Sequence, residues 1–343
     1  MNEERAIMKI DTQLVAQTPE RIAKEAQRLE KTGTDCIWTV EAGHDPFVPL
    51  TLIAAATSEV EIGTNIAVAF ARSPLSMAQV AWDLQNMSGG RLHLGLGTQV
   101  RAHIERRYSM PFEHPAARVT DYIHCLRAIW NSFQTGAKAD YKGQFYQFTL
   151  MNPMFNPGPI DQPKIPVYLA GVNARMCRAA GEVADGFHVH PMHSVAYLRD
   201  VVIPALDEGA RLRGKRASDL ELYSPVFVVT GETQEDFDKN EARVRAQIAF
   251  YGSTPSYRTL LTHHDMEDVG KELSARARRG DWDAMPKLVP DALLEQLAVI
   301  AKPGDLPQAL HDRYEGVLDR LSLYFPLGSD ERWYDFVQAF RRK

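Results

Sequence analysis

Residues 61–97, EIGTNIAVAFARSPLSMAQVAWDLQNMSGGRLHLGLG, predict a strand, a helix and a second strand in succession. Residues 61–69 are mostly β-branched or small and apolar, and Ser73 with Pro74 supplies a helix N-cap followed by proline at the first helical position. Apolar residues then recur at helical spacing, and residues 92–96 form a short apolar run. Two strands joined by a helix in this way are typical of a parallel sheet with crossover helices.

The same alternation continues in both directions from this unit. Thr18 and Pro19 repeat the cap-and-proline signal, and Gly33 can close the helix that they begin. Eight segments have the composition of short strands: residues 8–15, 36–40, 61–69, 92–96, 167–170, 186–189, 222–230 and 321–325. Eight such repeats predict an α/β fold, a (β/α)₈ TIM barrel, whose active site lies at the C-terminal ends of the strands.

Three connections are longer than the barrel needs. We expect one barrel domain over residues 1–343, with insertions at about 97–113 after strand four, 135–165 before strand five and 253–303 after strand seven. The first is expected to be a loop, and the second a small hairpin followed by a proline-rich surface segment. The third is expected to be helical and charged.

Composition excludes several classes of protein. The chain has 39 Lys and Arg against 44 Asp and Glu, a formal net charge of −5, and it has no long basic run, so we expect no binding to nucleic acid or to a membrane surface. The first ten residues lack an apolar export signal, and no stretch approaches the roughly 18 apolar residues of a membrane span, so a cytoplasmic protein is expected. Cys36, Cys125 and Cys177 are too few and too scattered for a disulfide framework, and we expect reduced, mostly buried thiols.

Five segments carry a resemblance to a known family: GTDCIWTVE (33–41), TSEVEIGTNIAVAFARSP (57–74), SGGRLHLGLG (88–97), PVYLAGVNARMCRAAGEVADG (166–186) and RAQIAFYGSTPSYRTLLT (245–262). Together they resemble the luciferase-like flavin and deazaflavin oxidoreductases, in particular the branch that uses coenzyme F420. The resemblance extends over nearly the whole chain. It implies F420 as cofactor, with FMN as the alternative, a small-molecule substrate, a homodimer, and a flavin or F420 reductase as a candidate partner.

The resemblance also implies a wall for the cofactor ring. It assigns this wall to a bulge after the third strand, at Asn65 and Ile66, joined by a non-prolyl cis peptide. Gly97 and Thr98 end the fourth strand, where a glycine lets a ring approach the backbone and the threonine can donate a hydrogen bond. Without the resemblance, residues 61–69 are better explained as a plain barrel strand and Gly97 with Thr98 as a tight strand exit. The third glycine of a dinucleotide fingerprint is missing.

A phosphate site is expected between the fifth strand and its helix. Free backbone N–H groups and the helix dipole at Gly171, Val172, Asn173 and Arg175 favour an anion, although ordinary N-capping also explains the asparagine. Four basic residues after strand four would suit the negatively charged tail of F420, and each alone also fits a solvated surface: Arg101, His103, Arg106 and Arg107.

Candidates for proton transfer also follow strands. They are Glu41 and His44 after strand two and His190 after strand six, where we expect at most one of His188 and His190 to reach the mouth. Relatives that oxidise alcohols carry an Asp-His pair after strand two, where this chain has Glu41 and then alanine, and often a glutamate at the position of Val100. No cluster has zinc-ligand spacing, and we expect no metal.

Three hypotheses follow. The first is an oxidoreductase that transfers hydride between F420 and a small organic substrate at the barrel mouth. The second is an FMN-dependent monooxygenase that uses reduced flavin and O₂. The third is a non-catalytic flavin- or deazaflavin-binding protein. This hypothesis stays open because the chain has alanine after Glu41 and Val100 where relatives carry acid or base groups.

Overall fold

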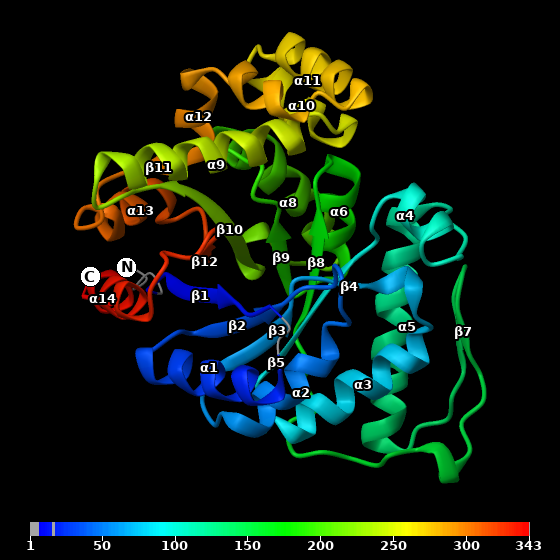
Figure 1. Ribbon diagram of the computed structural model, residues 1–343. Helices are drawn as coiled ribbons and strands as arrows, with labels where there is room; N and C mark the ends of the chain where they lie inside the picture. Colours follow the sequence, from blue (N-terminus) through cyan, green and yellow to red (C-terminus); the bar gives the residue numbers. More distant parts are fainter. Residues whose placement is uncertain (1–6, 16–17, 343) are drawn as a thin grey trace.

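Eight parallel strands close into a barrel at the centre of the molecule (Figure 1). The computed structural model describes residues 7–15 and 18–342. The strands are β1 (Lys9–Gln13), β2 (Cys36–Thr39), β3 (Glu61–Thr64), β5 (Leu92–Gly97), β8 (Val167–Gly171), β9 (Gly186–Val189), β10 (Glu221–Val229) and β12 (Arg320–Leu323). Each pairs with the next in this order, and β12 pairs with β1 to close the ring. The predicted (β/α)₈ TIM barrel is confirmed, and each of the eight expected segments contains a strand.

Helices surround the barrel (Figure 1). They are α1 (Pro19–Thr32), α2 (Phe47–Ala56), α3 (Pro74–Met87), α5 (Pro115–Thr135), α6 (Ala174–Val183), α7 (Val195–Tyr197), α8 (Ile203–Arg211), α13 (Leu306–Tyr314) and α14 (Asp330–Arg341). The local signals act as predicted: the Ser73 hydroxyl accepts from the backbone N–H of Ser76 at 3.2 Å, and Gly33 ends α1 with φ 86°. The sequence analysis did not include α14, which follows the last expected strand.

The three longer connections contain further elements. They are α4 (Arg101–Arg106), the hairpin β6 (Tyr141–Lys142) and β7 (Gln147–Phe148), and, after β10, α9 (Gln234–Gly252), α10 (Arg258–His263), α11 (Glu267–Arg279), a 3₁₀ segment (Trp282–Leu288), α12 (Asp291–Leu297) and β11 (Ala298–Ile300). The expected hairpin is confirmed, and the third connection is helical as expected except for β11. The first connection was expected to be a loop, which is wrong because it contains α4. β11 forms because β10 is nine residues long, and its last three residues extend past β9 and β12 and offer a free edge.

An ion cluster fills the floor of the barrel, at the N-terminal ends of the strands. Arg320 is fully buried, and its Nε and Nη2 lie 2.7 and 3.0 Å from the two carboxylate oxygens of Asp11, which is also fully buried. Its Nη2 and Nη1 also contact Glu61 at 2.6 Å and Glu221 at 3.2 Å. One guanidinium therefore joins β1, β3, β10 and β12 across the barrel.

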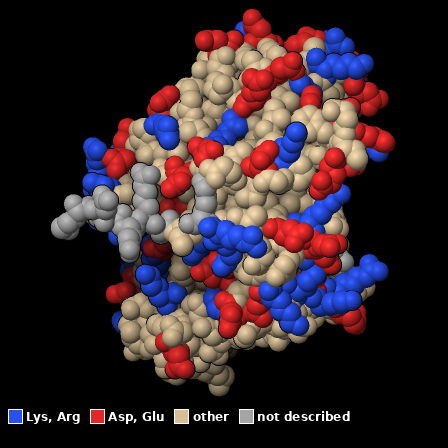
Figure 2. Space-filling model, turned by 90° about the vertical axis from the view of Figure 1, so that its left-hand side faces the viewer, with Lys and Arg blue, Asp and Glu red and all other residues tan. Residues whose placement is uncertain are grey.

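Surface charge and the cysteines agree with the composition. Acidic and basic side chains are intermixed over the face in Figure 2. Within residues 7–15 and 18–342, no helix is long and apolar enough to cross a membrane, and no group of three His, Cys, Asp or Glu side chains is placed to hold a metal ion. The three cysteines are free and buried, as expected.

Candidate active site at the barrel mouth

An apolar wall stands where the third strand reaches the mouth. The expected strand at 61–69 is two strands, β3 and β4 (Ala67–Val68), separated by the Asn65–Ile66 peptide, which is cis as predicted. β4 pairs with the end of β5, with Val68 opposite Gly97. A Cβ at Gly97 would lie 2.8 Å from both Cγ1 and Cδ1 of Ile66. The half-buried Ile66 side chain can therefore lie directly against the backbone only because position 97 has no side chain.

The rest of the β5 end is tightly packed. The Thr64 hydroxyl donates to the carbonyl oxygen of Gly95 at 2.6 Å, and a Cβ at Gly95 would lie 1.8 Å from the carbonyl oxygen of Thr64. Thr98, 9% exposed, donates its hydroxyl to the carbonyl of Gln99 at 3.2 Å. The predicted ligand donor at Thr98 is therefore engaged within its own loop.

Glu41, the predicted acid after β2, is anchored on both carboxylate oxygens. Oε2 accepts from the backbone N–H of Val68 and from Arg72, both at 2.7 Å, and Oε1 accepts from the Tyr108 hydroxyl at 3.1 Å. The side chain is only 7% exposed. Through these three contacts Glu41 ties the loop after β2 to β4, to Arg72 and to Tyr108.

His44 and the basic residues near it are more exposed. His44 makes no hydrogen bond or ion pair with any residue that the structure describes, and its ring faces solvent. Arg107 donates to the carbonyl of Ala42 at 2.8 Å, and Arg101 pairs with Glu105 at 2.7 Å. Two of the four expected basic residues, Arg101 and Arg107, are thus already engaged in contacts with neighbouring residues.

The turn between β8 and α6 has the features of an anion site. The Asn173 side chain caps α6 by accepting from the N–H of Met176 at 3.0 Å. The backbone N–H groups of Ala174 and Arg175 make no hydrogen bond with the described residues, and the exposed Arg175 makes no ion pair with them. Two free N–H groups and an unpaired guanidinium at a helix N-terminus fit a phosphate.

His190 lies just beyond β9 and is hydrogen-bonded through both ring nitrogens. Its Nδ1 accepts from the backbone N–H of Met192 at 3.1 Å, and its Nε2 is 2.8 Å from the Tyr257 hydroxyl. Burial, together with nearby His193, lowers the pKa of His190 to about 3, so the ring is neutral at physiological pH. A neutral imidazole whose Nδ1 accepts has its proton on Nε2. His190 therefore donates to the Tyr257 oxygen, and the hydroxyl proton of Tyr257 is directed elsewhere.

The histidines of this strand differ in depth. His188 and His190 are two residues apart and share the inward face of β9. His188 is 2% exposed and packs between Trp38 and Tyr223 inside the barrel, whereas His190 lies at the rim. Of this pair, only His190 lines the small cavity shared with Tyr257.

Tyrosines from the long insertion surround His190. The Tyr251 ring centre is 4.5 Å from that of His190, and its hydroxyl is 2.7 Å from the hydroxyl of Tyr324, which follows β12. Burial raises the pKa of Tyr251 and of Tyr257, so both phenols keep their protons at neutral pH. The sequence analysis missed these residues. The available signal was the segment YGSTPSY, 251–257, in which two tyrosines flank a turn within an otherwise charged insertion.

One small cavity brings two of these groups together. Gly171 and Val172 of the anion turn line it together with His190 and Tyr257. The anion turn and the hydrogen-bonded pair of His190 and Tyr257 are therefore adjacent parts of the mouth, whereas Glu41 contacts Val68 of β4 and Tyr108.

A closed barrel with polar side chains gathered at the C-terminal ends of its strands is the architecture of a TIM-barrel enzyme. The luciferase-like monooxygenase family model matches residues 6–320, and the chain belongs to this family of oxidoreductases. An uncharacterized protein of Mycobacterium tuberculosis is 46% identical over 322 residues, covering 94% of this chain and 95% of that protein. A 5,10-methylenetetrahydromethanopterin reductase of Archaeoglobus fulgidus is 23% identical, covering 88% of this chain and 89% of its own length. The structure of the coenzyme F420-dependent tetrahydromethanopterin reductase from Methanopyrus kandleri matches with a TM-score of 0.78 at 19% identity, covering 97% and 98% of the two chains.

Proposed function

We propose that this protein transfers hydride between coenzyme F420 and a small organic substrate at the barrel mouth. The observation that carries the proposal is the presence, at one barrel mouth, of an apolar wall and an anion turn. Such a cofactor needs a flat apolar surface for its ring and donors for its phosphate. The F420 dependence named for the Methanopyrus kandleri reductase supports the choice of cofactor.

The residues present fit this cofactor. Ile66 against Gly97 offers the surface for the ring, with Asn65 and Thr98 beside it. The free N–H groups after Asn173 and the unpaired Arg175 would hold the phosphate, with Gly171 and Val172 forming the turn. When bound, F420 supplies a two-electron hydride carrier.

We assign the proton partner of the hydride to Tyr257. Reduction of a carbonyl or imine adds hydride to carbon and leaves the oxygen or nitrogen in need of a proton. Tyr257 has a free hydroxyl proton, and the His190 N–H that it accepts would stabilise the phenolate that donation leaves behind. His190 in this arrangement positions the phenol and does not itself change charge.

The remaining candidates take supporting roles in this proposal. Glu41 positions the loop after β2 through Arg72 and Val68. His44 lies on that exposed loop and can meet substrate there. We further propose a cytoplasmic homodimer in which residues 1–343 form one barrel domain. Sedimentation would measure the assembly, and a single unfolding transition would support the single domain.

Titration of the purified protein with F420 and, separately, with FMN tests the cofactor assignment. Absorbance and fluorescence would follow binding in both redox states. We expect F420 to bind at least about tenfold more tightly than FMN, and Arg175→Gln to weaken both. The variant Arg178→Gln, three residues and about one turn further along α6, is the matched control.

The other outcomes are equally informative. Preference for reduced FMN would replace the proposal with an oxygen-dependent monooxygenase served by a reductase partner. Tight F420 binding without turnover of alcohols, aldehydes, ketones or imines would favour a non-catalytic binding protein. Binding of neither cofactor below about millimolar concentration would remove the proposed function and leave the barrel.

A further inference from the structure

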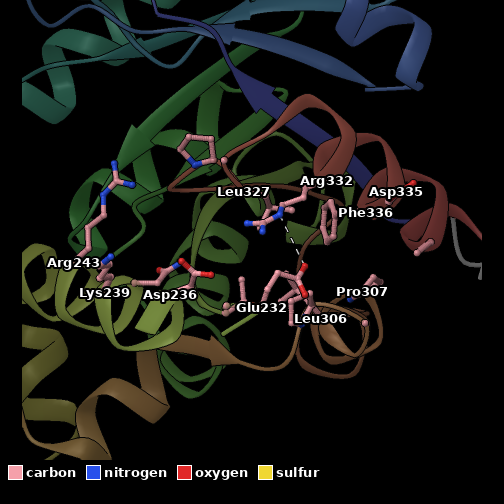
Figure 3. Close-up of a pocket in the computed structure, with 18 residues that line it drawn as sticks. Glu232, Asp236, Lys239, Arg243, Leu306, Pro307, Leu327, Arg332, Asp335 and Phe336 are labelled. Atoms are coloured by element: carbon pink, nitrogen blue, oxygen red, sulfur yellow. Dashed lines mark ion pairs between the residues drawn. The ribbon is translucent and has the colours of Figure 1, made fainter. Parts of the chain in front are cut away.

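A second cavity lies between α9, α13 and α14, beside the ends of β10 and β12 (Figure 3). Its volume is about 500 Å³, which is within the range of small-molecule sites. Residues 230–232 and 326–328, which follow the two strands, form part of its lining. None of the residues assigned above to the cofactor or to proton transfer lines it.

Basic and acidic side chains balance in the lining. The six are Lys239, Arg243, Arg332, Glu232, Asp236 and Asp335. Lys239 is paired with Glu235 at 2.6 Å, and Arg332 lies 3.9 Å from Glu232. Arg243 has no ion-pair partner in the part of the chain that the structure describes. The six formal charges of the lining cancel, and three of these groups have no ion-pair partner among the described residues: Arg243, Asp236 and Asp335.

Arg243 is held flat by an aromatic ring. Its guanidinium carbon lies 3.7 Å from the centre of the Phe325 ring. Stacking of this kind orients the planar group and leaves its N–H edges free for a two-point contact with a carboxylate. Figure 3 shows Asp236, Lys239 and Arg243 following one another along α9, with Arg332 reaching in from α14.

The opposite wall is apolar and bordered by helix N-termini. Leu306, Pro307, Leu327 and Phe336 offer the apolar surface. Three lining segments come just before helices: residues 230–232 before α9, 303–304 before α13 and 326–328 before α14. Helix dipoles favour negative charge at these N-terminal ends. The N-cap of α13, Asp305, makes no side-chain cap hydrogen bond.

We propose that this cavity binds a small organic carboxylate with an apolar body. The carboxylate lies on Arg243, and the body lies against Leu306, Leu327 and Phe336. The unpaired carboxylates of Asp236 and Asp335 oppose a dianionic phosphate more strongly than a monoanion, and the stacked guanidinium of Arg243 beside an apolar wall matches a single carboxylate with an apolar body. Its lining includes none of the residues assigned to the cofactor or to proton transfer, so this proposal does not depend on the function proposed at the mouth.

Isothermal titration calorimetry with octanoate tests the proposal without any cofactor. Octanamide, which has nearly the same shape and no charge, tests the need for the anion, and inorganic phosphate tests for a general anion contact. Arg243→Gln removes the guanidinium, and Ala339→Phe adds a ring to the cavity lining. Arg211→Gln is the control, because Arg211 is an exposed arginine on α8 outside the cavity.

We expect octanoate to bind one-to-one with a Kd below about 1 mM, and octanamide at least about tenfold more weakly. Arg243→Gln and Ala339→Phe should each weaken octanoate at least about tenfold, and Arg211→Gln should not change it. Equal binding of octanamide, phosphate binding as tight as octanoate, or no octanoate binding would overturn the proposal. So would unchanged affinity in Arg243→Gln or in folded Ala339→Phe. If Ala339→Phe does not fold, Arg243→Gln decides alone.

Discussion

Replacing Gly97 by alanine tests the proposed cofactor wall without knowledge of the substrate. The new Cβ would lie 2.8 Å from Cγ1 and Cδ1 of Ile66. Carbon atoms in contact normally stay about 3.5–4.0 Å apart, so the Ile66 side chain has to move by about 1 Å. Since the contacts are with the flexible end of a side chain, the side chain can turn away and the backbone can stay in place.

The expected cost falls on binding and not on folding. A shift of about 1 Å brings Ile66 into space that the cofactor ring would occupy, and removes a substantial part of the dispersion contact over that surface. We expect F420 affinity to fall about tenfold or more, equivalent to about 1.4 kcal/mol, with the free energy of unfolding changed by less than about 1 kcal/mol.

Gly95→Ala, two residues earlier on the same strand, is the matched control. Its Cβ would lie 1.8 Å from the carbonyl oxygen of Thr64, which is backbone and cannot turn away. This variant should lose about 3 kcal/mol or more of stability, or fail to fold. Fluorescence titration with F420 and urea unfolding measure the two effects. A Gly97→Ala protein that binds F420 as the wild type does would refute the wall, and a Gly95→Ala protein of wild-type stability would refute the packing.

Three further predictions follow. Tyr257→Phe should lower kcat by about a hundredfold or more while the Kd for F420 is unchanged, with the exposed Tyr334→Phe as control; an unchanged kcat would remove Tyr257 from proton transfer. Arg320→Met leaves Asp11 buried without its cation and should cost about 3–5 kcal/mol in urea unfolding, and a loss under about 1 kcal/mol would contradict the role of the ion cluster. The urea midpoint should fall as pH is lowered from about 6.5 to 4, because burial lowers the pKa of three histidines, to about 3 for His188 and His190 and about 4 for His193. The unfolded chain binds these protons below its ordinary histidine pKa near 6.5 and the native state does not, so a flat profile over this range would contradict their neutral burial.

The barrel was predictable because its signals are local. Ser73 with Pro74 and Gly33 fix helix ends through their own backbone preferences, and short apolar runs between them give the strands. The cis peptide at Asn65–Ile66 came from resemblance and not from such signals. β11 was missed because its pairing depends on the free end of β10, some 70 residues away in the chain.

For the candidate site, the sequence predicted which residues follow the strand ends, but not which residues they contact. Glu41, His190 and the turn at Gly171 were found because the C-terminal ends of barrel strands meet at one face. Their partners were not found, since Arg72 contacts Glu41 from 31 residues away and Tyr257 contacts His190 from 67 residues away. Such pairings depend on how helices and insertions pack, and nothing in the neighbouring sequence encodes them. The anchoring of Glu41 and the orientation of the Tyr257 proton therefore required the structure.

The ion cluster in the barrel floor has a consequence for synthesis on the ribosome. Arg320, the ion-pair partner of Asp11 among the described residues, is made 309 positions after it. Until β12 leaves the exit tunnel, the ring of strands stays open and this carboxylate has no buried counter-ion. The nascent chain therefore has to keep its earlier strands from aggregating while these 309 positions are translated. Shortening it before residue 320 should yield a chaperone client and not a smaller stable barrel.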